Sequence, residues 1–586
     1  MMTSIPRTSP GKNVLQLLTA ARIKRIIFGI DRRSTFRILG LLYVFSIAVS
    51  YLTLVAPGRS YVRGWLNDVM WLLDIANRVH LGQVPYKDFH LVQGPAVALI
   101  PGLGLDLGIN AGAIFGFNSV VVAALVLLAA LVAMPRRLTL PSAVLVFVFV
   151  CLLIVVPMGE AHDYLTISWG TFYNRHGWAA LIVILLFYVE PEPIKPHDKW
   201  VDAFALAALV LLEIYTKFTF GAIALGFVAA NTVVSRYNRQ VSIRSLFLIV
   251  AFAASLEVAF RFHMAYWHNI TEFVSWVKGG RLGPRAVASI LIANCWIILG
   301  CLGAAVATRI AGRRSAFDGL YVIGCILSSM LLRAGVGDNS TIGLVALVAV
   351  PICLGEVARR AEAQGAATQF SSSGRASRLV WGACLFLALM FVSNEAANRI
   401  IAWGGYFAKV SRADAHPLPG TPPRLSGFIV PTVGENDLYD LHKGAGAFDP
   451  DLTTYRTLLA GDSLGTVDYM RSVVEGANLL QSVHYRNRSV FTFDMVDPFT
   501  FALDMVPTRN GYPLFWLGGP ITIDPKLLPR FEQLVADADF IMVPLLPYSP
   551  DTTKNMMRIY GPYLRQNYKL LIGSPHWELW AREKSP

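Results

Sequence analysis

A group of polar and charged residues follows the first long apolar segment of the chain, where a further membrane helix would be expected. Asp68 stands at the start of a predicted short helix, and Asp88 and His90 lie later in the same stretch. Acidic side chains held against a bilayer usually serve catalysis or ion handling, because they are costly to bury there. A carboxylate so placed can take a proton from an acceptor hydroxyl as a general base. We therefore interpret residues 56–109 as an active-site loop.

Each of these residues also has a purely structural interpretation. Asp68 suits the N-cap position before a helix. Asp74 has Arg78 at i+4, so an ion pair on one helix face explains it without chemistry. Asp88 and His90 either line an acceptor cleft, ligate a metal or belong to a solvated loop.

A second polar segment lies between two later apolar runs. Glu160, His162 and Asp163 form either a second acidic patch or a divalent-metal site, although their spacing matches no strict ligand motif. Arg175 and His176 follow just before the next apolar run. Because arginine binds phosphate oxygens in a bidentate manner, we predict that this pair meets a lipid phosphate. The alternative is an interfacial pair whose charged ends reach back to the headgroups.

Further cations fall at the predicted outer ends of apolar runs. Lys217 interrupts an apolar hairpin, and a buried ammonium group requires an anion. Arg281 belongs to the segment 263–285, whose mix of aromatic and basic residues is typical of an interfacial helix. Arg333 is close in sequence to Asp338 and is explained by an ion pair with it. We therefore add Lys217 and Arg281 to the predicted phosphate-binding residues.

The composition is that of a polytopic membrane protein. Of the 586 residues, 54% are hydrophobic and only 15% are charged, and the mean hydropathy is +0.50. About eleven apolar runs are long enough to span a bilayer, the shorter ones only just. They are 36–55, 110–134, 140–157, 177–190, 201–216, 219–235, 245–262, 286–308, 316–333, 341–357 and 379–397.

The basic residues predict the orientation, because short cytoplasmic loops collect Lys and Arg. The basic clusters between the apolar runs all fall on one side. They are Arg22 to Arg37, Arg136 with Arg137, Lys195 with Lys199, Arg236 to Arg244, Arg309 to Arg314, and Arg359 to Arg378. An odd number of spans then places the N-terminus in the cytoplasm, and the active-site loop and the C-terminal part outside. Topology thus explains the net charge of +13 without nucleic-acid binding.

Composition divides the chain into four parts. Residues 1–35 are predicted to be a basic amphipathic segment on the inner leaflet, without a cleavable signal peptide. Residues 36–400 hold the apolar runs and all the cysteines, which show no metal-ligand spacing. Prolines mark a linker at 401–430, and 431–586 has soluble composition. In this last part we predict strands at 489–493, 540–543, 569–572 and 577–580 and helices at 451–480 and 529–536, which make a small α/β or α+β domain.

The first loop also resembles the first extracytoplasmic loop of bacterial GT-C membrane glycosyltransferases, a class that includes the protein O-mannosyltransferases and the aminoarabinose transferase of lipid A. The matching elements, in order, are Asp68, Gly82, Pro85 with Tyr86, Lys87 to Phe89, and Gly94 with Pro95. Two positions depart from the class. Where the class commonly has two adjacent acidic residues, this chain has Asp68-Val69. Where the class often has Lys-Pro at the end of the loop, this chain has Gln93-Gly94-Pro95.

The resemblance implies a polytopic α-helical, GT-C-like fold in a bacterial inner membrane, with a C-terminal periplasmic domain. It implies inverting transfer of a hexose or pentose from a polyprenyl-phosphate donor to a glycolipid, polysaccharide or protein of the cell envelope. Asp68 is then the general base, and Arg175, His176, Lys217 and Arg281 hold the leaving phosphate. The resemblance does not imply a particular cofactor, and it leaves open whether the protein requires a divalent metal ion.

Two other classes of protein stay open. Lys217 with Glu213, and Glu257 with Arg261, would line the path of a transporter or flippase, although the two halves show no repeat. A non-catalytic envelope assembly protein is the other class, if Asp68 only caps its helix. The sequence contains no glycine-rich phosphate loop, nucleophile elbow or His-Glu-x-x-His motif, so it gives no support to nucleotide hydrolysis or proteolysis.

Overall fold

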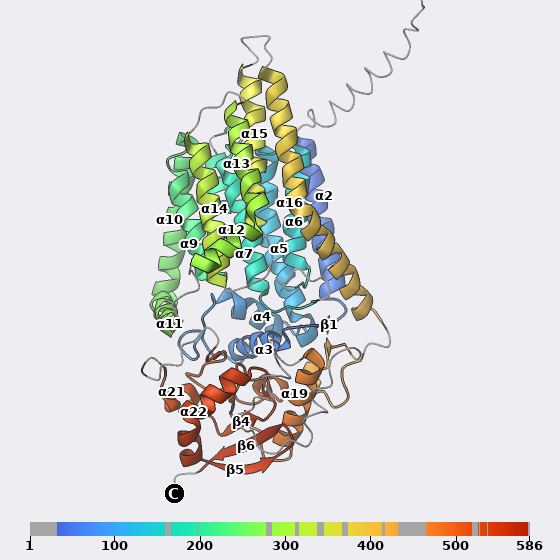
Figure 1. The fold of residues 1–586 in the computed structure, drawn as a ribbon, viewed down its shortest axis with the longest axis vertical. Coiled ribbons are helices and arrows are strands. Elements are labelled where there is room, and N and C mark those ends of the chain that lie inside the picture. Colours follow the sequence, from blue (N-terminus) through green and yellow to red (C-terminus); the bar gives the residue numbers. More distant parts are fainter. Residues whose placement is uncertain are drawn as a thin grey trace, which may run out of the picture.

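A computed structural model describes most of the chain. The described residues are 32–158, 166–195, 197–276, 284–310, 316–336, 345–365, 373–412, 416–431, 465–518, 526, 528–535 and 537–583. Long helices form a bundle, and the elements after residue 465 form a mixed layer at one end of it (Figure 1). The predicted amphipathic segment at 1–31 lies outside the described residues.

Each predicted apolar run contains helical structure. The helices are α2 (Arg32–Leu54), α5 (Ile114–Ala133), α6 (Leu140–Val155), α7 (Phe172–Leu185), α8 (Asp198–Thr216), α9 (Phe218–Asn231), α10 (Arg236–Phe260), α12 (Pro284–Ala293), α13 (Cys295–Ile310), α14 (Ala316–Val336), α15 (Ala349–Gly365) and α16 (Ser373–Val410). By length and apolar composition, 4 helices of the described part can cross a membrane, or up to 5 if the bent pair α12–α13 is one span. The predicted number of about eleven crossings therefore stays a prediction.

Helix α16 extends further than the sequence indicated. It continues to Val410, so the first residues of the predicted 401–430 linker are helical. Ala402, Tyr406 and Val410 are buried at successive i,i+4 positions, which gives this end of the helix an apolar face. The first proline after it is Pro417. Tertiary packing of that face thus extends the helix beyond its hydrophobic run.

The predicted active-site loop folds into two helices between the bundle and the mixed layer, α3 (Leu66–His80) and α4 (Ala96–Asp106) (Figure 1). Apart from Asp68, Val79 and His80, every residue of α3 is buried. A short strand before it, β1 (Ser60–Tyr61), pairs in parallel with β2 (Phe428–Ile429). The loop is therefore held between two parts of the chain that are distant in sequence.

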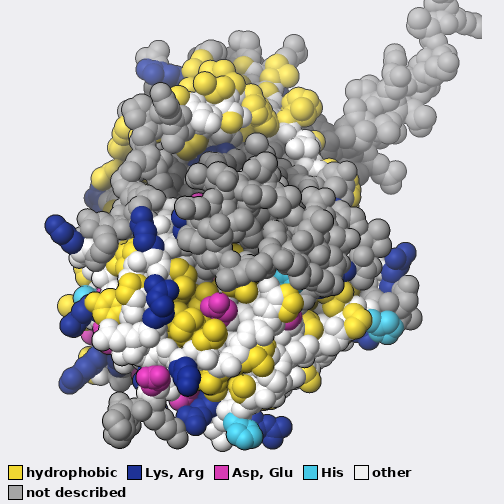
Figure 2. Space-filling model, turned by 60° about the horizontal axis from the view of Figure 1, so that its bottom comes forward, with side chains coloured by type: hydrophobic (Ala, Val, Ile, Leu, Met, Phe, Trp, Pro, Cys, Tyr) yellow, Lys and Arg dark blue, Asp and Glu magenta, His cyan; other side chains and the backbone are white. Residues whose placement is uncertain are grey.

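The mixed layer contains a four-stranded sheet in the order β3-β4-β6-β5. Its elements are α19 (Thr466–Gln481), β3 (Val490–Thr492), α20 (Phe499–Ala502), α21 (Phe531–Val535), β4 (Phe540–Pro544), α22 (Pro550–Asn567), β5 (Tyr568–Gly573) and β6 (Trp577–Arg582). Strands β3 and β4 are parallel, and the other pairs are antiparallel. All four predicted strands are present. On the outer face of this layer, Lys and Arg side chains are scattered among hydrophobic ones, without one large basic patch in the coloured area (Figure 2).

The opposite end of the bundle is held by buried ion pairs. Asp202 of α8 accepts from both Arg136 and Arg137, and its second oxygen also accepts from the Tyr237 hydroxyl at 2.6 Å. Asp202 and Arg137 are fully buried. The network connects α8 and α10 to Arg136 and Arg137, which lie in the turn after α5.

Candidate active site

Asp68 lies inside the first turn of α3 and is not its N-cap. The N-cap position belongs to Trp65, which has a positive φ of 53° and makes no side-chain capping bond. Asp68 still contributes a negative charge to the positive end of the helix dipole. The N-cap interpretation of Asp68 is therefore wrong, and its carboxylate is left for other partners.

The carboxyl group of Asp68 is only partly accessible and poorly solvated. Its one hydrogen bond among the described residues comes from the Asn67 amide, with Nδ2 at 3.0 Å from Oδ1. Burial raises the pKa of Asp68 to about 7, and the Asn67 hydrogen bond opposes that rise. A carboxylate with this pKa is partly ionised near neutral pH, and such a pKa suits a general base.

Two distant segments complete the surroundings of Asp68. Gly170 approaches from the end of the second loop, and a Cβ there would lie 3.2 Å from the Asp68 Cβ. From the mixed layer, the Met495 sulfur accepts from Asn67 at 3.7 Å. Burial raises the pKa of Tyr469 well above its usual range, and the negative charges of Asp494 and Asp68 add to that rise. No local pattern of residues points to Tyr469 or Met495, because both reach the site only through folding.

Two acidic residues of the mixed layer that the sequence analysis did not single out have structural roles. Asp494 accepts three backbone N–H groups, those of Met495, Tyr548 and Ser549, at 2.6–3.1 Å. Burial raises its pKa to about 7. Asp497 accepts from Thr492 and from the backbone of α20. Because backbone groups bind both carboxylates, these residues fix loops next to the site and are not free to act as bases.

Asp74 forms the predicted ion pair. The Arg78 Nε lies 2.8 Å from the Asp74 Oδ2, and both side chains are buried. Arg78 also donates to the Thr508 carbonyl oxygen at 2.6 Å. Burial raises the pKa of Asp74 to about 6, and the Arg78 charge opposes the rise. The ion pair is the one that the i,i+4 spacing predicted, and the Thr508 contact of Arg78 attaches α3 to the mixed layer.

Asp88 and His90 connect the loop to its neighbours. The Asp88 carboxylate accepts from the Val84 backbone at 2.7 Å and so closes the turn. His90 stacks on Trp276, with ring centroids 5.4 Å apart, and its Nε2 lies 3.5 Å from Glu272. Both partners belong to α11 (His263–Trp276), which confirms a helix in the predicted interfacial segment. In the described part of the chain, neither residue bonds to Asp68, so their place in an acceptor cleft stays a prediction.

Several predicted residues cannot be placed. Glu160, His162, Asp163 and Arg281 lie outside the described residues. Among the residues that are described, no group of three or more His, Cys, Asp or Glu side chains is arranged to hold a metal ion.

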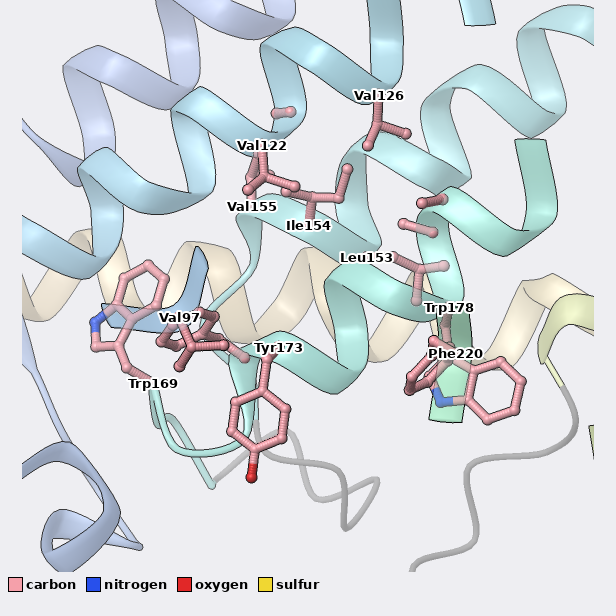
Figure 3. Packing of buried hydrophobic residues seen from close by; sticks show 14 of the residues in the cluster. Val97, Val122, Val126, Leu153, Ile154, Val155, Trp169, Tyr173, Trp178 and Phe220 are labelled. Carbon is pink, nitrogen blue, oxygen red and sulfur yellow. The ribbon is translucent and has the colours of Figure 1, made fainter. Parts of the chain in front are cut away.

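Lys217 lies at the turn between α8 and α9, on the same side of the molecule as Asp68. Its Nζ donates to the Asn174 side chain at 2.9 Å and lies 5.4 Å from the centre of the Tyr173 ring. That ring is in edge contact with Trp71 of α3, with centroids 6.4 Å apart. Tyr173 points out of the bundle beside Trp169 (Figure 3). A continuous aromatic contact thus connects the helix of Asp68 with the ammonium group of Lys217.

The end of the active-site loop packs directly on this turn. The Gly94 N–H donates to the Thr216 carbonyl at 3.0 Å. A Cβ at Gly94 would lie 2.2 Å from the Tyr215 carbonyl, so only glycine fits there. Gln93-Gly94-Pro95 therefore lies where the loop packs on the turn that leads into Lys217.

Arg175 and His176 point into the bundle. Arg175 is buried and donates from Nη1 to the carbonyl oxygens of Val156 and Met158, the latter at 2.8 Å. These carbonyls follow the end of α6, so Arg175 satisfies a helix terminus. His176 is buried, with its Nε2 at 3.4 Å from the Ser119 hydroxyl. Phosphate binding by these two residues stays a prediction, and Lys217 is the better-placed cation.

No family model matches this sequence, and no curated protein matches it. Structures of ArnT from Cupriavidus metallidurans are similar to this one, at 13% identity over 92% of this chain and 97% of theirs. The TM-score is 0.42 for the apo state and 0.45 for the state bound to undecaprenyl phosphate. The arabinofuranosyltransferase AftD from Mycobacteria is similar over 94% of this chain and 40% of its own, at 13% identity and a TM-score of 0.40. The predicted resemblance is confirmed as a likeness of overall structure, which assigns no residue here a role.

Proposed function

We propose that this chain is a membrane glycosyltransferase of the GT-C type. It transfers a hexose or pentose from a polyprenyl-phosphate donor to a glycolipid, polysaccharide or protein of the cell envelope, on the external side of a bacterial inner membrane. The observation that carries the proposal is the Asp68 carboxyl group, partly accessible at the membrane-proximal loop and with a pKa of about 7. A group in this state is suited to taking a proton from an alcohol.

In the proposed reaction Asp68 takes the proton of the acceptor hydroxyl. The acceptor oxygen forms a bond to the anomeric carbon from one side, while the bond from that carbon to the phosphate oxygen breaks on the other. The electron pair of the broken bond leaves with the polyprenyl phosphate, and the configuration of the sugar inverts. The ammonium group of Lys217, half-buried over Tyr173, stabilises the negative charge that develops on the phosphate.

The residues that the transporter alternative would place along a substrate path do not pair with one another. Lys217 donates to Asn174, while both carboxylate oxygens of Glu213, which is buried, lack a hydrogen-bond partner in the described part of the chain. Glu257 pairs with His263, at 3.1 Å, and not with Arg261. A buried carboxylate without a partner is also what a transport path needs, so the transporter stays the alternative that the experiment tests.

The test uses the purified full chain in lipid nanodiscs with a panel of polyprenyl-phosphate-linked pentoses and hexoses and an envelope extract as acceptor. We expect release of polyprenyl phosphate that depends on the acceptor, and a product whose anomeric configuration is opposite to that of the donor, read by NMR. Retention of configuration would contradict the role of Asp68 as a base. Donor movement across proteoliposomes without any sugar transfer would favour the transporter.

A further inference from the structure

A cavity of about 280 Å³ lies in the half of the bundle remote from Asp68. Its walls are the end of α7, the last turns of α9 and the first turns of α14. Asp68 and Lys217 are at the other ends of these elements, because Gly170 precedes α7 and Lys217 precedes α9. We refer to this cavity between α7, α9 and α14 as the inner slot.

The inner slot is apolar and opens at the lipid-facing surface. Val233 and Leu320 line it and are 58% and 64% exposed, so its mouth lies where membrane lipid surrounds the helices. Tyr188 and Tyr321 stack in its wall, with ring centroids 4.0 Å apart. The lining includes Asn231, Ser328 and Ser329, but most of it is apolar, which favours an alkyl chain over ordered water. Its natural occupant is an alkyl chain.

Two glycines make the slot wide. Gly226 of α9 and Gly324 of α14 both line it, and a Cβ added at either position would have nothing within 4 Å. Glycine inside a helix costs about 1 kcal/mol relative to alanine and here serves no backbone need. The missing side chains therefore leave space that a ligand can fill.

Basic side chains stand next to the mouth of the slot. Arg236 and Arg239 follow Val233 at the start of α10, and both are exposed. The Arg239 Nε donates to the Thr232 carbonyl at 3.1 Å, which holds its guanidinium group beside the mouth. Within the described residues, no acidic side chain forms an ion pair with either arginine. Clustered basic residues at this membrane surface attract anionic headgroups.

We propose that the inner slot binds one acyl chain of an anionic phospholipid, whose phosphate lies against Arg236 and Arg239. These arginines belong to a cluster predicted to be cytoplasmic, so the lipid comes from the inner leaflet. The site is independent of the proposed sugar transfer and of Asp68.

The interior of the bundle offers no route to the slot for the polyprenyl tail of a donor held at Lys217. Between Lys217 and the slot, α7 and α9 are in close contact, since a Cβ at Gly177 would lie 2.8 Å from the Phe220 ring. Trp178 adds an edge contact to the same ring, with centroids 5.3 Å apart (Figure 3). This contact closes the interior route between the two sites.

The experiment is native mass spectrometry of the full chain purified in mild detergent, followed by titration with phosphatidylglycerol or phosphatidylcholine. We expect the wild type to retain phosphatidylglycerol. Gly226→Leu and Gly324→Leu should each fill the slot and weaken retention about tenfold or more, because a chain and a leucine side chain cannot share it. Gly303→Leu in α13 is the matched control, since a Cβ there also meets nothing within 4 Å, and it should retain the lipid.

The headgroup is tested separately. The double variant Arg236→Ala with Arg239→Ala should bind phosphatidylglycerol roughly tenfold more weakly while its binding of phosphatidylcholine is unchanged. A wild type that retains no more phosphatidylglycerol than the filled variants overturns the proposal, as does retained polyprenyl phosphate in its place. If one of the two leucine variants does not fold, the other still provides the test, because Gly226 and Gly324 lie on different helices. As an independent measurement, a wild-type melting temperature that phosphatidylglycerol does not change also overturns the proposal.

Discussion

A carboxylate at one end of the bundle has several charged and hydrogen-bonding partners, whereas a carboxylate at the other end has few. Asp202, at the end remote from the mixed layer, accepts from two arginines and a tyrosine hydroxyl. Asp68, at the other end, has one amide donor within the described structure and a pKa raised to about 7. A fully compensated charge stabilises the fold, whereas an under-compensated one is ready to exchange a proton. We expect the number of bound donors, and not the pKa alone, to separate a structural carboxylate from a catalytic one, because Asp494 has a similar pKa and accepts three backbone N–H groups.

The strongest test of this contrast is Asp68→Asn. This change keeps the size of the side chain and removes the base, so transfer should fall by about two to four orders of magnitude while the protein remains in the membrane. The measurement is single-turnover transfer in nanodiscs. Asp74→Asn is the matched control on the same helix, where the loss should appear in stability and not in the chemical step. Near-normal transfer by a folded Asp68→Asn protein would contradict the assignment.

Asp202→Asn should give the opposite result. It leaves the buried Arg137 without its counter-charge, which costs about 3–5 kcal/mol of folding free energy, while Arg136 keeps its ion pair with Asp198. The measurement is the thermal unfolding midpoint in detergent, together with transfer per folded molecule, which should be unchanged. Tyr237→Phe removes only one hydrogen bond to the same carboxylate and should cost about 1 kcal/mol. Equal losses for the two variants would show that Asp202 is not the centre of the network.

Lys217→Met tests the cation of the proposed site. It removes the charge near the leaving phosphate while keeping most of the apolar stem, so transfer should fall about tenfold to a hundredfold. Lys217→Arg should recover part of the loss. Measuring polyprenyl phosphate binding alongside separates affinity from turnover. If Lys217→Met and the wild type have the same donor affinity and turnover, another cation holds the phosphate.

The pH dependence gives a smaller and sharper prediction. Because the base must be ionised, kcat/KM should fall as the pH drops below about 7. Asn67→Leu removes the hydrogen bond that lowers the pKa of Asp68. The pH at which kcat/KM begins to fall should therefore rise by about one unit in this variant. An unchanged profile in this variant would mean that another group titrates.

The same raised pKa affects stability with a definite sign. The pKa of Asp68 is higher in the folded state than its ordinary value of 3.8. The contribution of the protonated Asp68 to the free energy of unfolding is therefore present at low pH and is lost as the pH rises toward about 7. Asp68→Asn removes this dependence. The variant should therefore unfold at a higher temperature than the wild type at pH 8, with a smaller difference at pH 4.

Some local features could be predicted from sequence alone. The Asp74–Arg78 pair follows from helix geometry, and all four strands of the mixed layer were recognised from their apolar and aromatic residues. Helix α22 was missed, although Met556, Tyr560 and Leu564 recur at i,i+4 and are buried. These are cases in which neighbours in the sequence carry the information.

The sequence by itself determined the apolar helices, the predicted orientation and the acidic residue at the start of α3. Only the tertiary structure decided which of these charges are compensated. The structure shows Arg175 donating to the Met158 carbonyl beyond the end of α6, and phosphate binding by it stays a prediction. The pKa of Asp68 depends on burial by the second loop and the mixed layer, far from it along the chain. Desolvation is a property of the surrounding volume, so no local pattern of residues can specify it.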